Sequence, residues 1–204
     1  MKMSRRAFLR NQAAVTAAAV AGTAIAAEND EGLYRIRHGR IRQSVVPWCF
    51  RPMSAGELIE ASARIGLRSV ELIGAEHWSA LKGRGMTCAI AGSHGFARGF
   101  AHPEEHEQCL EILRRNIDLA SNAGVPSIIT FSGFRRGISD ENGMRNMVDG
   151  LKKIVGHAEK KRVTLCLEML NSRVNVEMKG HPDYFCDDIE RSVEICRRIG
   201  SERM

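Results

Sequence analysis

The chain has 204 residues, of which 44% are hydrophobic and 26% are charged, so it can bury one sizeable core and leaves little room for two domains. The formal net charge is +6, but four of the positive charges lie in the first ten residues. The rest of the chain has 26 basic and 24 acidic residues, a balance that gives little electrostatic reason to expect DNA binding. We therefore expect no nucleic-acid partner.

The N-terminus has the order of a secretory signal. A basic start precedes an apolar run from Ala13 to Ala27, in which Ala24 to Ala26 form an A-x-A cleavage site. The stretch from Ser4 to Arg10, S-R-R-A-F-L-R, resembles a twin-arginine signal. The run is too short and too rich in alanine to predict a stable membrane anchor.

This pattern predicts that residues 1–27 are an export signal and that residues 28–40 are a linker. The expected partner of the signal is the twin-arginine export machinery, which would deliver the protein to the periplasm or the extracellular space. The alternative is an amphipathic N-terminal helix, although the run is apolar on all sides.

After the linker, short β-rich runs alternate with longer runs of helical period. Ser54 and Glu57 have the spacing of a capping box, while Gly66 and Gly124 stand where helices are expected to end. Strands are expected at 43–50, 69–73, 86–91, 127–131 and 163–169. Helices are expected between Ser54 and Gly66, at 75–81, from Pro103 to Gly124, around 144–158 and at 189–199.

Strands that are apolar on successive residues and that alternate with helices predict a parallel sheet covered by helices. A doubly wound sheet and a (β/α)8 barrel both fit this order. No G-x-G-x-x-G follows the first strand, so the dinucleotide-binding fold loses its best support. The roughly 175 residues after the signal suffice for about five of eight barrel units. We therefore expect residues 41–204 to form the N-terminal part of an incomplete α/β, TIM-type parallel barrel.

Ligands of parallel β/α folds bind at the carboxyl ends of the strands, so polar residues there are the candidates for a site. Glu168 is the most informative, because an ionised carboxylate within an apolar strand costs several kcal/mol unless a metal or a cation accompanies it. A salt bridge to a neighbouring strand remains the alternative. Arg135 is a candidate partner for a substrate carboxylate, or else a solvated loop charge. The other candidates for substrate binding are Trp48, Glu71, His94, Asn171 and His181. A structural acid inside the barrel remains the alternative for Glu71, and an ordinary loop histidine remains the alternative for His94 and for His181.

Several segments resemble the xylose-isomerase-like barrel superfamily of sugar isomerases and epimerases. They are Glu168 to Ser172 at the fifth strand, Gly66 to Leu72 at the second, and His181 to Tyr184 after the long loop. Val46 to Phe50 and Ser132 to Gly137 are most similar to its hydroxypyruvate isomerase branch. The resemblance extends from about Arg42 to Met204.

The resemblance implies a divalent ion, Mg²⁺ or Mn²⁺, held by four side chains on the fifth to eighth strands, and a proton transfer between adjacent carbons through an enediolate. Glu168 corresponds to the first metal-binding glutamate, which is also catalytic. The other three ligands would lie beyond Met204, so we expect the N-terminal part of an isomerase that is inactive alone.

The expected substrate is a small sugar or hydroxy-keto acid, and a homo-oligomer remains open. Two other functions also remain open: an exported sugar-binding barrel without catalysis, and an endonuclease IV-like enzyme acting at abasic DNA. The near-neutral mature charge and the export signal both count against the DNA enzyme.

Overall fold

The computed structural model describes residues 34–177 and 179–204. The predicted export signal lies outside the described residues. The chain divides into two units, Met1–Arg35 and Ile36–Met204, and all the elements described below belong to the second unit.

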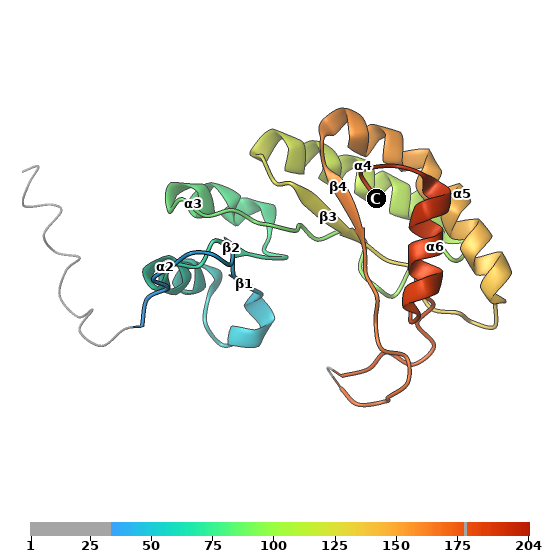
Figure 1. Cartoon of the computed structure of the whole chain (residues 1–204), viewed down its shortest axis with the longest axis horizontal. Coiled ribbons are helices and arrows are strands. Elements are labelled where there is room, and N and C mark those ends of the chain that lie inside the picture. The colour runs from blue at the N-terminus through green and yellow to red at the C-terminus, as the bar shows by residue number, and fades with distance from the viewer. Residues whose placement is uncertain (1–33, 178) are drawn as a thin grey trace, which may run out of the picture. The chain divides into compact units, whose positions relative to one another are not determined.

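Among the described residues, four short strands form two parallel pairs (Figure 1). In the first pair β1 (Ser44–Val45) lies beside β2 (Ser69–Val70), with Ser44 opposite Ser69. In the second pair β3 (Ser127–Thr130) lies beside β4 (Thr164–Leu167), with Ser127 opposite Thr164. Parallel strands joined in chain order through helices confirm the predicted incomplete α/β barrel.

The predicted third strand connects these two pairs. Thr87 forms a parallel bridge with Ser69 of β2, and Ala91 forms one with Ile128 of β3. The prediction of a regular strand over 86–91 was wrong, because only Thr87 and Ile90 hydrogen-bond to the segment around β2, and the chain passes to β3 at Ala91. It therefore builds no continuous ladder of its own.

The first two strands are shorter than predicted. Pro47 begins the 3-10 helix Pro47–Phe50, since proline has no N–H to donate to a ladder and its φ suits a first helical turn. In the second strand, Leu72 has a φ of 53°, a left-handed backbone conformation that interrupts the extended chain after Val70.

The helix boundaries follow local chemistry. In α2 (Ala55–Ile65) the Ser54 side chain accepts from the N–H of Glu57, which completes the predicted capping box. Gly66 and Gly124 end α2 and α4 (His106–Ala123) in the left-handed conformation that glycine adopts without strain. In the described part of the chain the remaining α-helices are α3 (Trp78–Gly83), α5 (Asp140–Lys161) and α6 (Ile189–Ile199), and the 3-10 helices Ala75–His77 and Pro103–Glu105 precede α3 and α4.

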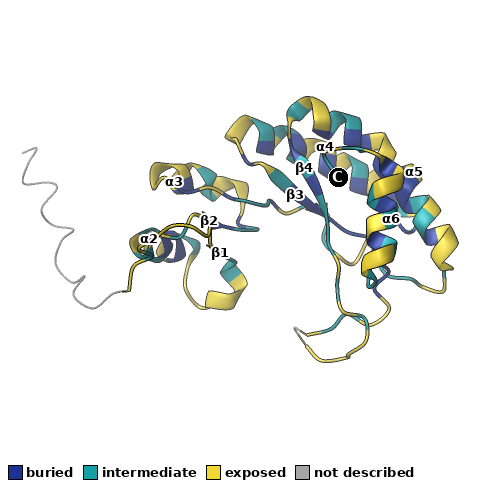
Figure 2. Cartoon of the chain, viewed as in Figure 1, coloured by how far each residue is buried: buried dark blue, intermediate teal, exposed yellow. Residues whose placement is uncertain are grey.

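The core lies between the helices and the strands. α4 and α5 pack against each other and against β3 and β4, while α6 packs against α5. These helices carry a buried side and an exposed side, as Figure 2 shows. Ile128 and Leu165 of the strands and Leu113 and Leu151 of the helices are almost completely buried. Each such side chain contributes about 1.5–3 kcal/mol of hydrophobic free energy relative to an exposed one.

The end of the described chain lies beside β4. The N–H of Leu165 donates to the carbonyl oxygen of Arg203 at 2.8 Å, and a guanidinium nitrogen of Arg203 lies 3.3 Å from the hydroxyl of Thr164. These contacts place the segment at the edge of β4 that faces away from β3. Within the described ranges, no helix combines the length and the apolarity needed to cross a membrane.

Candidate functional site

Glu168 stands at the carboxyl end of β4. Its N–H donates to the carbonyl oxygen of Thr130, the last residue of β3, at 2.9 Å. The backbone position of Glu168 is therefore fixed by the ladder between the two strands. This is the end of the sheet at which parallel β/α folds bind ligands.

The loop after β4 folds back onto this strand end. Tyr184 is fully buried, and its hydroxyl donates to the carbonyl oxygen of Glu168 at 3.2 Å and accepts from the N–H of Ser132 at 3.2 Å. Tyr184 also forms an antiparallel bridge with Phe134, and the N–H of Phe185 donates to Gly133 at 3.0 Å. The returning part of the loop is thereby attached to the β3–α5 connection.

The same loop brings His181 and Asn171 to Glu168. The N–H of His181 donates to the carbonyl oxygen of Asn171 at 2.6 Å. The ring of His181 contacts Phe96 in a T-shaped arrangement, with the centroids 4.7 Å apart. The side-chain oxygen of Asn171 accepts from the N–H of Arg173 at 2.9 Å, which stabilises the start of the loop.

The carboxyl group of Glu168 is half-buried. Burial raises its pKa, because the charged form loses hydration, and the nearby imidazole of His181 partly opposes this rise. A carboxyl group with a raised pKa at a strand end is suited to take up and return a proton.

His94 lies beside the carboxyl end of β3. Its Nδ1 is 3.1 Å from the carbonyl oxygen of Arg98, and its Nε2 is 3.1 Å from the hydroxyl of Thr130. Since a carbonyl only accepts, Nδ1 carries the proton and Nε2 accepts from Thr130. Burial lowers the pKa of His94, which favours this neutral form.

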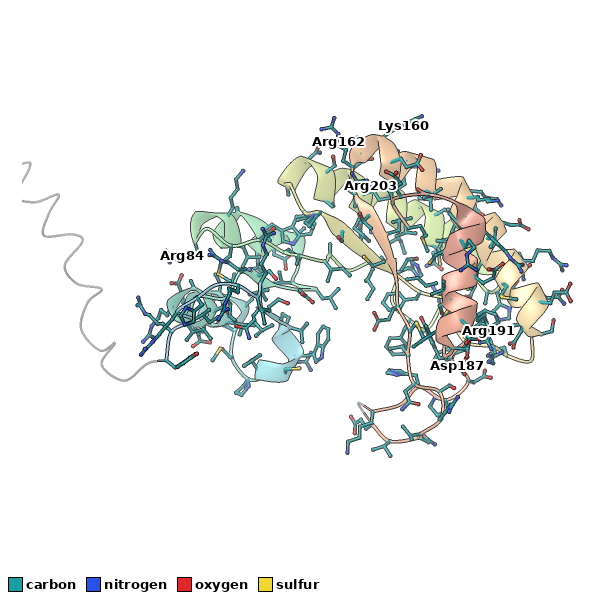
Figure 3. All side chains as sticks on the ribbon, viewed as in Figure 1. Arg84, Lys160, Arg162, Asp187, Arg191 and Arg203 are labelled. Carbon is teal, nitrogen blue, oxygen red and sulfur yellow. The ribbon has the colours of Figure 1, made fainter. Side chains whose placement is uncertain are left out.

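Arg135 lies in the middle of the β3–α5 connection and contacts two carboxylates. It forms ion pairs with Asp140 and, at 3.0 Å, with Asp187, and its guanidinium lies 5.0 Å from the centroid of Phe185. Asp187 also accepts from Arg191 at 2.8 Å, and Figure 3 shows these two residues together at the start of α6. The binding of a substrate carboxylate by Arg135 stays a prediction.

Asp187 was not among the residues predicted from the sequence, although its half-buried carboxylate joins two arginines and the hydroxyl of Ser172. Its spacing of four residues from Arg191 was the only signal in the sequence that could have predicted an ion pair for Asp187. Burial alone would raise the pKa of Asp187, but the hydrogen bonds from Ser172, Arg191 and Arg135 outweigh it and lower the pKa.

Trp48 and Glu71 follow the first strand pair. Trp48 lies in the 3-10 helix after β1 with 41% of its surface exposed. Glu71 is half-buried, accepts from the hydroxyl of Ser44, and donates its N–H to Val45 at 2.8 Å. In the part of the chain that the structure describes, no hydrogen bond or ion pair joins either residue to Glu168, so their role in substrate binding stays a prediction.

Among residues 34–177 and 179–204, no three histidine, cysteine, aspartate or glutamate side chains form a group that could hold a metal ion. Glu168 could supply a carboxylate oxygen and His181 an imidazole nitrogen. Mg²⁺ requires near-octahedral coordination by oxygen, which these two side chains do not provide. The described residues therefore do not fit a complete site for the ion that the sequence resemblance implies.

Comparison with known proteins agrees with this fold. The sequence model of a family described as "Xylose isomerase-like TIM barrel" matches residues 57–204. A crystal structure of an AP endonuclease, family 2, from Brucella melitensis has a TM-score of 0.66 and 17% identity, over 80% of this chain and 66% of that one. A 3-keto-D-glucoside 4-epimerase from E. coli has a TM-score of 0.64 and 15% identity, over 80% and 66%.

A crystal structure of the IolI protein with a zinc atom has a TM-score of 0.65 and 14% identity, over 80% of this chain and 60% of that one. The chain thus spans less than two thirds of the length of these solved structures. Identities this low establish the fold alone. No curated protein sequence gives a significant match.

Proposed function

Because the chain belongs to the xylose isomerase-like TIM barrel family, we propose that it forms the N-terminal part of a sugar or keto-acid isomerase or epimerase in which Glu168 transfers the proton. The observation that carries this proposal is the half-buried carboxyl group of Glu168 at the carboxyl end of β4, with a raised pKa and with His181 nearby. The 3-keto-D-glucoside 4-epimerase of similar fold supports the reaction class.

An aldehyde and its isomeric hydroxy-ketone differ in the placement of two hydrogens, one shared between the two adjacent carbons and one shared between their oxygens. In the proposed reaction ionised Glu168 removes the proton from the carbon next to the carbonyl, which leaves an enediolate, and the protonated carboxyl group then returns the proton to the neighbouring carbon. The second proton moves between the two oxygens, so the substrate keeps its composition. The raised pKa of Glu168 increases its basicity, while His181 stabilises the ionised form.

The proposal includes a divalent ion, to which Glu168 would contribute one ligand. Such an ion, when bound, supplies positive charge to the substrate oxygens. Since the described residues form no complete ligand group, the steps assigned here concern only Glu168 and His181.

A hydroxypyruvate-type substrate is the finer proposal. It rests on the similarity of segments 46–50 and 132–137 to that branch and on Arg135 as the partner of the substrate carboxylate. Asp140 is the carboxylate that the substrate would displace from Arg135, because its side chain is 51% exposed, whereas that of Asp187 is 20% exposed.

We propose further that the protein is exported by the twin-arginine pathway, on the basis of the pattern from Ser4 to Arg10. A reporter fused after residue 40 is expected to leave the cytoplasm. Replacement of both Arg5 and Arg6 by lysine preserves the charge and is expected to retain the reporter inside. Unchanged export of that variant would exclude this pathway.

The isomerase proposal is tested on a protein extended through the three remaining barrel strands. It is expected to isomerise hydroxypyruvate or a small ketose only when Mg²⁺ or Mn²⁺ is present, and Glu168→Gln is expected to abolish turnover. Glu177→Gln, an exposed change in the same loop, serves as the control and should keep full activity. Full activity of Glu168→Gln would overturn the assignment.

Two further measurements separate the alternatives. A stoichiometric divalent ion in the purified extended protein supports the enzyme, whereas sugar binding without an ion supports a non-catalytic barrel. Binding to abasic duplex DNA that weakens steeply with salt would favour a DNA-repair enzyme instead.

A further inference from the structure

An open groove of about 460 Å³ lies at the amino-terminal end of the first strand pair. It is lined by Gly39, Arg42, Arg68, Gly85, Met86 and Thr87. Arg68 precedes β2 and Glu71 follows it, so the groove lies at the opposite end of this strand from the residues predicted to bind substrate. Three extended residues separate the two backbone positions by roughly 10 Å.

The groove carries two uncompensated positive charges. Within the described ranges, neither Arg42 nor Arg68 forms an ion pair or a side-chain hydrogen bond, and no acidic residue lines the groove. The neighbouring Arg84, labelled in Figure 3, differs because it forms an ion pair with Glu60. Two guanidinium groups in one groove repel each other unless an anion lies between them.

The backbone around Arg68 is held in place. The N–H of Arg68 donates to the carbonyl oxygen of Gln43 at 3.0 Å, and the N–H of Thr87 donates to the carbonyl oxygen of Arg68 at 3.1 Å. Gly39 has a φ of 56°, and a Cβ there would lie 3.9 Å from Nη2 of Arg68. The guanidinium of Arg68 therefore extends from a fixed β segment toward Gly39, where no side chain stands in its way.

The segment of chain that precedes β1 is also basic. Residues 36–42 read I-R-H-G-R-I-R, with three arginines, one histidine and no acid. This local charge attracts anions toward the groove at low salt.

We propose that this groove binds a phosphate group through Arg42 and Arg68. A guanidinium presents a planar pair of donors that matches two oxygens of an oxyanion, and two such groups neutralise the two charges of a phosphate monoester. Thr87, whose hydroxyl donates to the carbonyl oxygen of Cys88 at 3.3 Å, supplies a further polar group on the groove wall. The groove has room for the phosphate and a small substituent.

The test measures the affinity of the full chain for inorganic phosphate by titration calorimetry at low ionic strength. Arg42→Gln and Arg68→Gln are each expected to weaken binding about tenfold, the loss of one charge-assisted contact, and the double variant is expected to abolish it. Arg84→Gln is the matched control, because it removes a nearby arginine that already has a carboxylate partner. Arg68→Lys keeps the charge without the planar donors and should bind with intermediate affinity.

A phosphate monoester can belong to a soluble molecule or to a lipid, so a second arm uses phosphatidylcholine vesicles with and without phosphatidic acid. Binding of inorganic phosphate alone indicates a soluble ligand, and binding of phosphatidic acid vesicles that the double variant loses indicates a lipid headgroup. Absence of binding in both arms would overturn the proposal. An equal loss in Arg84→Gln would overturn it as well, because it would indicate unspecific attraction to surface charge.

Discussion

The hydroxyl of Tyr184 donates a hydrogen bond of 3.2 Å to the backbone carbonyl oxygen of Glu168, across 16 residues of sequence. The same hydroxyl accepts from the N–H of Ser132, so one buried oxygen joins the ends of β3 and β4 to the loop that carries His181. The position of the candidate base therefore depends on a buried tyrosine that was not among the candidate catalytic or substrate-binding residues.

Tyr184→Phe is expected to destabilise the protein by about 1–3 kcal/mol, because it leaves the N–H of Ser132 buried without an acceptor. The free energy of unfolding measured in urea checks this value. Tyr34→Phe removes a hydroxyl from a side chain that is 76% exposed and should change stability by less than about 0.5 kcal/mol. Equal effects of the two changes would contradict the role given to Tyr184.

Glu168→Gln is expected to stabilise the fold at pH 7 while it removes activity. The folded-state pKa of Glu168 is raised by burial, so folding favours the protonated form and stability is lost as pH rises through that pKa. A neutral glutamine avoids this loss, by less than about 1 kcal/mol because water still reaches the group.

The gain in stability should disappear at about pH 3, where the Glu168 carboxyl of the parent is protonated in both the folded and the unfolded states. Urea unfolding of both proteins at the two pH values measures it. Glu111→Gln, an exposed change on α4, should show no such dependence on pH. A variant that is less stable than the parent at pH 7 would contradict the expected sign.

Asp187→Asn is expected to cost about 1–3 kcal/mol at pH 7, since two arginines lose their shared, largely buried carboxylate. The lowered pKa of Asp187 means that its contribution is present above the unfolded-state pKa and is lost as pH falls through the folded-state value. Asp118→Asn breaks more exposed pairs with Lys161 and His157 and should cost less than about 1 kcal/mol. The two variants are compared by chemical denaturation at pH 7.

Two glycines of α5 are expected to respond with opposite signs. A Cβ at Gly143 would overlap the buried ring of Phe185, so Gly143→Ala should destabilise by about 1–3 kcal/mol. Gly156 has no heavy atom within 4 Å of the corresponding position, so Gly156→Ala should stabilise by about 0.5–1 kcal/mol. Thermal unfolding of the two variants is the measurement, and a shared sign would show that the helix does not pack as described.

The helix ends were predictable because their causes are local. Ser54 and Glu57 satisfy each other's backbone groups within one turn, and Gly66 and Gly124 adopt a conformation that suits glycine. The strands were less predictable, because the ladder of segment 86–91 depends on two distant neighbours and the end of β2 depends on the left-handed Leu72. The hydrophobic pattern of a segment shows neither its neighbours in a sheet nor a single left-handed residue.

The candidate site was also predictable only in part. The place of Glu168 at a strand end follows from its apolar surroundings in the sequence, since the carboxyl ends of parallel strands lie together. The return of His181 to Glu168 could not be derived, because it depends on the bridge between Phe134 and Tyr184 across the loop. Asp187 was missed because its charge is compensated by Arg135, which is distant in sequence.

The long loop after β4 has an anchored base and an exposed tip. Tyr184, Phe185 and Cys186 at the base are fully buried, while Val174, Asn175 and Val176 toward the tip are exposed. Added residues near 175 would therefore extend into solvent and leave Glu168 in place, whereas an insertion after Tyr184 would shift the whole returning segment. Variation in loop length among relatives, and cleavage by proteases, should accordingly concentrate at the tip.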